Sequence, residues 1–235
     1  GSAAHSLFLE GVDRMAVLDF DSYRTNDSKA ARTAARMAGK HPVLIGKAPG
    51  LRTMVTLART AFERCADFGY AFDEGLPELC IIWKDRAGVW CRARPDWLSL
   101  DSVAMLDYKT TTDASPAYFS KQISRMNYHI QASFYSRGLS ALTERESKFV
   151  FLAQEIPAPH GCTFHGCAPS LQQIADDKVE TAIVRFAQGL QSGIWPGYPN
   201  RIFWAEAAAW QINEHVPEER EEIAFDPAKM WDKNQ

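Results

Sequence analysis

Three ionisable residues near the middle of the chain have the types and spacing needed for phosphodiester hydrolysis. Asp96 ends one apolar stretch, and Asp107 and Lys109 end the next. Because successive side chains on a strand point to opposite faces, Asp107 and Lys109 share a face while Tyr108 points away. Two strands that end side by side would bring both carboxylates and the ammonium to one point. The spacing therefore predicts a metal site with a base beside it.

The chemistry that we expect at this site is metal-assisted hydrolysis. Hard divalent cations such as Mg²⁺ take a few oxygen ligands and keep several waters, so Asp96, Asp107 and the backbone carbonyl of Tyr108 are a sufficient protein contribution. Such an ion acidifies water, which then attacks phosphorus, and Lys109 would orient or help to deprotonate that water. We expect Mg²⁺, with Mn²⁺ as a substitute ion. An isolated Asp-x-Lys tripeptide is more often a surface ion pair, so its sequence context decides the interpretation.

That context is a family resemblance at several places along the chain. Arg94-Pro95-Asp96, then ten residues and Asp107-Tyr108-Lys109-Thr110, resemble the PD-(D/E)xK nuclease signature. Residues Gly1–Glu10 resemble the histidine-containing helix that precedes the core in the RecB-like branch, and Gln131–Tyr135 is similar to that branch's Gln-x-x-x-Tyr helix. Within this branch the RecE-like exonuclease domain is the most similar over residues 1–200, because of Glu78, Arg94–Trp97, Asp113–Pro116 and Trp195–Tyr198.

The resemblance implies a fold and a set of site residues. The fold is an α/β PD-(D/E)xK restriction-endonuclease-like core with a mixed central sheet flanked by helices. The implied metal ligands are His5, Asp96, Asp107 and Tyr108, and the implied catalytic residues are Asp96, Asp107, Lys109 and Glu78. Glu78 is the weaker candidate, because a carboxylate at the start of a strand is equally consistent with a solvated position.

DNA-binding residues are expected around the same site. The family helix implies Gln131 and Tyr135, although surface polarity and core packing explain this pair almost as well. Basic residues near the proposed site add Arg94, Lys121 and Arg125. Together they predict a local basic groove.

RecE-like enzymes digest the 5′-ended strand of duplex DNA and leave a 3′ overhang for an annealing protein. The resemblance therefore implies a Mg²⁺-dependent exonuclease that acts on double-stranded DNA ends, with a RecT-like annealing partner and a cyclic homo-oligomeric assembly. Two alternatives are a structure-specific or repair endonuclease on the same core and a catalytically silent DNA-binding scaffold. Asp96, Asp107 and Lys109 together argue against the scaffold.

Composition narrows the function classes. With 46% hydrophobic and 23% charged residues and a net charge of −3, the chain does not coat nucleic acid through a uniformly basic surface. No apolar run approaches the roughly 18 residues of a membrane helix, so no membrane association is expected and cytoplasm is the expected location.

Five scattered cysteines do not form a disulfide framework. Residues 160–167 hold two His and two Cys, but zinc sites use two separated pairs, so we interpret this segment as a strand or hairpin.

The helices and strands that must position the site are predicted from hydrophobic periodicity and from the Gly and Pro residues that end each element. We expect an N-terminal helix that carries His5. Because the chain begins within this helix, we also expect a longer N-terminal region. Residues 20–50 are predicted as a mobile, irregular insertion with a basic helix over 29–37. The expected elements after it are a helix over 51–68, strands near 78–84, 88–95 and 103–109 that start the sheet, helices over 116–138, a strand over 148–155, and a helix from Ser170, capped by a Ser-x-x-Gln box, to Gly193. Residues 1–200 form the nuclease domain, and 201–235 add a C-terminal helix and an acidic tail.

Overall fold

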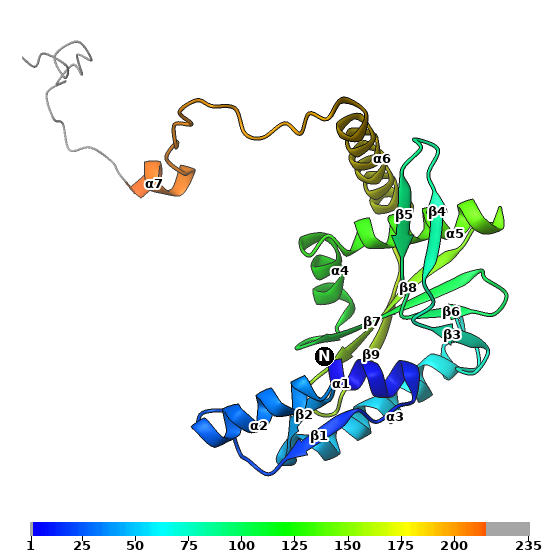
Figure 1. Cartoon of the computed structure of the whole chain (residues 1–235), viewed down its shortest axis with the longest axis vertical. Coiled ribbons are helices and arrows are strands. Elements are labelled where there is room, and N and C mark those ends of the chain that lie inside the picture. The colour runs from blue at the N-terminus through cyan, green and yellow to red at the C-terminus, as the bar shows by residue number, and fades with distance from the viewer. Residues whose placement is uncertain (1, 215–235) are drawn as a thin grey trace, which may run out of the picture. The chain divides into compact units, whose positions relative to one another are not determined.

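A five-stranded mixed sheet lies at the centre of the fold in the computed structural model, which describes residues 2–214 (Figure 1). Its strand order is β3-β6-β7-β8-β9, with β7 and β8 parallel and the other pairs antiparallel. The expected α/β class with a mixed sheet flanked by helices is confirmed. The elements are α1 (Ser2–His5), the π-helix η1 (Ser6–Glu10), β1 (Met15–Leu18), α2 (Asn26–Met37), β2 (His41–Leu44), the 3-10 helix η2 (Ile45–Lys47), α3 (Ala48–Arg64), β3 (Gly75–Pro77), β4 (Ile81–Lys84), β5 (Trp90–Ala93), β6 (Trp97–Ser99), β7 (Ala104–Thr111), α4 (Pro116–Arg125), α5 (Tyr128–Thr143), β8 (Lys148–Glu155), β9 (Cys162–His165), α6 (Pro169–Ser192) and α7 (Ala209–Glu214).

The central sheet is covered on both faces, and the alternation of β7 and β8 distributes their side chains between two cores. Leu106, Tyr108 and Leu152 pack with α1, η1 and α3 in one core. Met105 and Phe151 pack with α4, α5 and α6 in the other. The continuous apolar centre of β8 is therefore the pattern expected for a strand buried on both faces.

The segment 78–95 differs from the prediction. Its strands β4 and β5 form a separate two-stranded hairpin. The strands that extend the central sheet beyond β7 are instead the short β6 and β3. Two residues interrupt what the sequence presented as continuous strands: Glu78 has a left-handed backbone with φ 54°, and Pro95 has no amide hydrogen for a ladder. The prediction that strands 78–84 and 88–95 start the central sheet is wrong.

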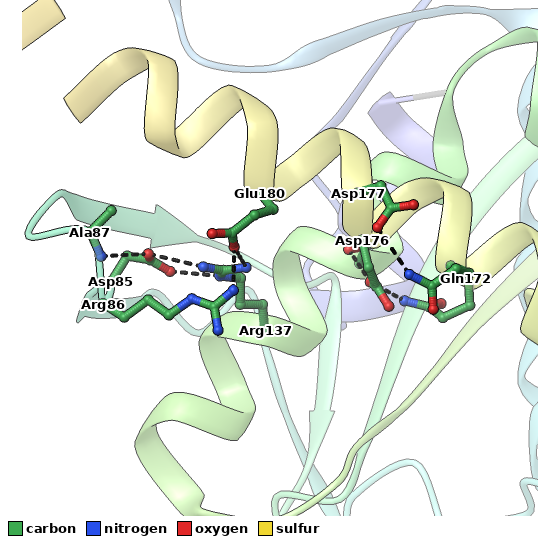
Figure 2. Close-up of polar contacts among 10 residues, drawn as sticks. Asp85, Arg86, Ala87, Arg137, Gln172, Asp176, Asp177 and Glu180 are labelled. Carbon is green, nitrogen blue, oxygen red and sulfur yellow. Dashed lines mark hydrogen bonds and ion pairs between the residues drawn. The ribbon is translucent and has the colours of Figure 1, made fainter. Parts of the chain in front are cut away.

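A network of charged residues attaches this hairpin to the helices (Figure 2). Arg137 of α5 donates from Nε and Nη2 to the buried carboxylate of Asp85 at 2.6 and 3.0 Å, and from Nη1 to Glu180 of α6 at 2.6 Å. Arg86 donates to the same Glu180 oxygen at 2.6 Å. Gly138, one residue after Arg137, leaves space for the Trp83 ring, since an added Cβ would lie 2.5 Å from it. The hairpin is thus held against α5 by packing and by charge.

Residues 15–47 are more regular than predicted. The strands β1 and β2 pair in parallel, joined by α2, whose first turn is capped by Thr25 accepting from the Ser28 amide at 3.2 Å. The prediction of an irregular segment with one helix is therefore wrong on its regularity, and its mobility stays a prediction.

Helix α6 begins one residue before the predicted cap and uses no side-chain cap, because Pro169 occupies the first turn and Ala168 the N-cap position. Its buried face carries Ala175, Val179 and Ile183, whereas Ile174, Phe186 and Leu190 are about half exposed. Gly193 ends the helix in the left-handed conformation, as expected.

Contacts divide the chain into two units, which meet between Ile194 and Trp195. In the second unit, residues 195–208 have no helix or strand, and α7 covers Ala209–Glu214. The predicted acidic tail from 215 onward lies outside the described residues. Among the residues that are described, no helix is long and apolar enough to cross a membrane.

Candidate metal centre and catalytic site

The pairing of β6 with β7 brings the two predicted aspartates together. Trp97 lies opposite Leu106 in this antiparallel ladder, so Asp96 and Asp107 are neighbours across it. The sequence suggested that each aspartate ends a strand, but the structure differs. Asp96 directly precedes β6, and Asp107 lies in the middle of β7 with only 2% of its surface exposed. The backbone N–H of Tyr108 donates to Asp96 Oδ2 at 2.7 Å, which fixes one carboxylate to the strand that carries the other.

Three side chains from distant parts of the sequence form a cluster of metal-ligand type. His5 Nε2 lies 2.7 Å from Asp96 Oδ2, and His5 Nδ1 lies 3.6 Å from Glu78 Oε1. One ligand atom from each of these residues lies within 4.8 Å of the others. Within residues 2–214 this is the one group of three or more such side chains that meets that criterion. Asp107 is not part of it, and the backbone carbonyl of Tyr108 stays a predicted ligand.

The position of His5 is set by the contacts of its helix with α3 and β7. Arg59 of α3 donates to the carbonyls of Leu7 and Phe8 at 3.3 and 3.1 Å, which satisfies acceptors at the end of η1. The Phe8 ring packs on Tyr108 with centroids 4.7 Å apart. His5 is therefore held over β7 by the buried face of its own helix.

Glu78 reaches the cluster because of its backbone conformation. Its N–H donates to the carbonyl of Asp96 at 3.1 Å, which joins the β3–β4 and β5–β6 connections. Its carboxylate accepts from Arg94 Nε at 2.8 Å, so Arg94, predicted to bind DNA, is paired with Glu78 in this structure. The side chain of Arg94 is still 64% exposed and is free to contact a ligand through its other nitrogens.

The second half of the site lies on the α5 side of β7. The Lys109 ammonium contacts Asp107 Oδ1, and Gln131 of α5 contacts both residues: its Nε2 donates to Asp107 Oδ2 at 2.9 Å, and its Oε1 accepts from Lys109 at 3.3 Å. Lys109 Nζ also lies 4.8 Å from the centre of the Tyr128 ring, a cation–π geometry. The first turn of α5 thus holds the Asp107–Lys109 pair in place.

Electrostatics within the site shift two pKa values. Burial disfavours the imidazolium of His5, but its hydrogen bond to Asp96 and the charges of Asp96, Glu78 and Asp107 outweigh burial and raise the pKa of His5 above 6.5. Burial and the nearby Asp96 charge raise the pKa of Asp107, although Lys109 and Gln131 act in the opposite direction. A cation bound here would therefore relieve repulsion between carboxylates.

The other predicted DNA-binding residues lie in two kinds of place. Lys121 and Arg125 are exposed on α4, and no structural contact tests their role. Tyr135 is half-buried and packs edge-on against Phe149 at 5.9 Å, so it contributes to the core beneath α5. The residue that the sequence analysis missed is Tyr128. It lies three positions before Gln131, and i,i+3 spacing on a helix could have identified it once Gln131 was placed at the site.

The donor set fits a hard divalent cation. It combines two carboxylates with an imidazole, all partly open to solvent, with side-chain exposures of 22%, 12% and 30% for Glu78, Asp96 and His5. A further carboxylate belongs to the neighbouring group, since Asp107 Oδ1 is buried and accepts the charge of the Lys109 ammonium. In contrast, residues 160–167 form β9 and the turn before it, as the sequence predicted, and do not cluster as ligands.

Comparisons with known proteins identify the family and a similar fold. The family model of the PDDEXK-like domain of unknown function (DUF3799) matches residues 1–204. The fold is similar to a crystal structure from Eubacterium rectale designated "Putative exonuclease", with a TM-score of 0.53 and 13% sequence identity over 92% of this chain and 78% of that one. A crystal structure designated SSO0001 aligns over 73% of this chain and 71% of that one, with 11% identity and a TM-score of 0.33. No curated protein sequence matches the chain.

Proposed function

Because this chain belongs to the PDDEXK-like family DUF3799, we propose that it is a Mg²⁺-dependent nuclease that hydrolyses phosphodiester bonds of double-stranded DNA from its ends. The observation that carries the proposal is the contiguity of two groups: the His5–Glu78–Asp96 cluster and the Asp107–Lys109–Gln131 group are joined by the bond from Tyr108 N–H to Asp96. The designation of the E. rectale protein supports exonuclease over endonuclease activity.

His5, Glu78 and Asp96 would hold the ion, and Asp107, which lies opposite Asp96 across the β6–β7 ladder, would be a fourth donor. A bound Mg²⁺ supplies Lewis-acid chemistry, by polarising a phosphoryl oxygen and acidifying water. Lys109 would orient the attacking water and stabilise the negative charge that develops on the phosphoryl oxygens. Gln131 donates to Asp107 Oδ2, and Asp107 Oδ1 contacts the Lys109 ammonium, so the two side chains hold the Asp107 carboxylate in one orientation. Mn²⁺ would substitute for Mg²⁺ because it accepts the same oxygen and imidazole ligands.

We further propose the finer features that the RecE-like resemblance implies: digestion of the 5′-ended strand, a 3′ overhang, delivery of that overhang to a RecT-like annealing protein, and a cyclic homo-oligomer around the duplex. Their support is the sequence resemblance. A cytoplasmic location belongs to the same proposal.

The proposal is tested with purified protein on linear and closed-circular duplex DNA, each with Mg²⁺, Mn²⁺ or EDTA. We expect Mg²⁺-dependent degradation of the linear form alone. End-labelled duplexes, labelled at the 5′ or the 3′ end of one strand, then give the polarity. Nicking of the circular form would favour the endonuclease alternative, and the absence of cleavage with either metal would overturn the proposal. A Lys109→Ala variant serves as the control for contaminating nucleases.

A further inference from the structure

A basic pocket lies beside the proposed hydrolytic site, and neither the metal cluster nor the Asp107–Lys109 group uses it. It has a volume of about 430 Å³, within the usual range of roughly 300–1,000 Å³ for ligand pockets. Its walls come from α1, α2, β2, η2 and the start of α3. The lining residues are Ser2, Ala3, Tyr23, Arg32, Arg36, Lys40, His41, Pro42, Val43, Leu44, Lys47 and Leu51.

The charge of this pocket has one sign. Four of its lining residues are Lys or Arg, a fifth is His41, and none is Asp or Glu. From Ser28 to Lys47 the sequence holds no acidic residue at all, in a chain whose net charge is −3. Arg36, Lys40 and Lys47 are exposed, and within residues 2–214 none of them forms an ion pair. Unpaired cations that converge on one concave surface, on an otherwise acidic protein, mark an anion site.

Two further features favour an anion with several acceptor oxygens. The Arg32 guanidinium lies over the Tyr23 ring, 4.9 Å from its centre, which restrains its orientation. Tyr23 Oη, at the same wall, is shielded from water and has no hydrogen-bond partner in the described chain. A planar donor and an unsatisfied hydroxyl beside point charges form a donor set typical of phosphate binding.

The location relates the pocket to the reaction. Ser2 and Ala3 of α1 line the pocket, and His5 of the same helix belongs to the metal cluster. At a rise of about 1.5 Å per residue, Ala3 and His5 are separated by roughly 3 Å along the helix axis, so the pocket and the metal cluster are neighbours at this helix. Figure 1 shows α2 next to α1, whereas α6 and the β4–β5 hairpin lie on the other side of the central sheet.

We propose that this pocket binds phosphate groups of the DNA strand whose scissile bond lies at the metal centre. The proposal rests on the proposed nuclease function, because it takes DNA as the ligand. Arg32, Arg36, Lys40 and Lys47 hold phosphate oxygens next to the one being hydrolysed, and so fix how far the strand enters the site. Both a terminal phosphate monoester and an internal diester present this chemistry.

The test is DNA binding measured by fluorescence anisotropy in EDTA, so that binding is observed without hydrolysis. The probes are labelled duplexes of identical sequence with a 5′-phosphate, a 3′-phosphate or hydroxyl ends. The test variant is Arg36→Gln/Lys40→Gln. The matched control, Lys84→Gln/Arg185→Gln, makes the same charge change at exposed positions of β4 and α6. Circular dichroism spectra verify that both variants are folded.

We expect the test variant to bind at least about tenfold more weakly near 0.1 M salt, and its plot of log affinity against log salt to lose a slope of about 2, one per phosphate contact. The control should stay within about twofold. If the wild type prefers one phosphorylated end and the variant loses that preference, the ligand is a terminal phosphate. Equal weakening on all three probes identifies internal phosphates.

Equal affinity and equal salt slope for wild type and test variant would overturn the pocket proposal, as would a wild type that binds none of the probes. Cleavage by the wild type in Mg²⁺ is scored separately. A wild type that binds through the pocket but never cleaves would defeat the proposed nuclease function while leaving the pocket assignment intact.

Discussion

At the scale of single residues, Asp107 and Lys109 combine a functional role with an electrostatic cost. Asp107 is buried, and its raised pKa means that the folded protein disfavours the ionised form. A group of this kind favours folding at low pH, and its contribution is lost as the pH rises through its folded-state pKa. Removal of the Asp107 charge is therefore expected to stabilise the folded protein and to abolish activity at the site.

Substitutions of Asp107 and Lys109 should separate activity from stability. Asp107→Asn should lower the cleavage rate by at least about 10³-fold, because the amide cannot act as an anionic ligand, while its melting temperature at pH 7.5 should equal or exceed that of the wild type. Lys109→Ala should lower the rate to a similar extent. Single-turnover cleavage and thermal unfolding of the same preparations measure both effects. A folded Lys109→Ala protein with near wild-type cleavage would refute the assigned role of this lysine.

His5 gives a prediction about pH. Because its pKa is raised above 6.5, protons compete with a metal ion for the imidazole at and somewhat above that pH. Metal affinity should therefore increase from pH 6 to pH 8, by up to about tenfold per unit where the imidazolium predominates. Calorimetric titration with Mn²⁺ measures this dependence. His5→Gln should bind Mn²⁺ more weakly and with a flatter pH profile, and an unchanged profile would exclude His5 as a ligand.

The sequence predicts the relative positions of site residues where they lie close together in the chain. Alternation along a strand correctly put Asp107 and Lys109 on one face, because that relation spans three residues. The contacts of Glu78 with His5 and Arg94 depend instead on a left-handed backbone residue and on pairing across distant segments. Nothing in the local pattern specifies these, so Glu78 could be named from the sequence but not positioned.

At the scale of elements, α5 connects the site to the rest of the fold. Its first turn presents Tyr128 and Gln131 to Lys109, and two turns later Arg137 binds Asp85 of the hairpin. The sequence predicted helices over 116–138 and the strand 148–155 from their periodicity. It did not reveal that the strands of 78–95 leave the sheet, because a hairpin and a sheet edge have the same alternation of apolar and polar residues.

Tyr128 is predicted to be a positioning residue for Lys109. Tyr128→Leu should lower kcat about tenfold with little change in KM, since the ring restrains the ammonium, and leucine keeps apolar packing against Phe119 and Phe151. Tyr128→Phe keeps the aromatic face and should restore at least half of the wild-type kcat. Steady-state kinetics on a linear duplex measure both. Equal loss in the two variants would show that the hydroxyl, and not the ring, is required.

Arg137 should matter for stability in a way that Arg86 does not. Arg137→Ala leaves the Asp85 carboxylate buried and unpaired, and should cost about 2 kcal/mol, less than a fully buried pair because the Arg137 side chain is 22% exposed. Arg86, at 74% exposed, is the matched control, and Arg86→Ala should cost under about 0.5 kcal/mol. Urea unfolding compares the two. Arg137 lowers the pKa of Asp85, so this contribution should be present above pH 4 and lost as the pH falls further.

At the scale of the whole molecule, a net charge of −3 limits how firmly a single subunit can hold DNA. A ring of subunits would add several basic pockets around one duplex and prevent escape between cleavage steps. We therefore expect a trimer or tetramer whose inner wall carries Lys121 and Arg125, and processive digestion of a long linear duplex. Light scattering at micromolar concentration and a product-length assay test this together. A monomer that digests distributively would contradict it.

The two-layered arrangement around β7 has a consequence for when the protein can act. His5 and Asp96 depend on the core that contains Phe8 and Tyr108, whereas Lys109 depends on α5, which packs in the other core. The two halves of the site therefore meet only when both cores have formed, and these cores include Leu152 of β8 and Ile183 of α6, which lie beyond α5 in the chain. A chain that ends before α6 should therefore lack the assembled site, so hydrolytic activity is expected only once the whole fold has formed.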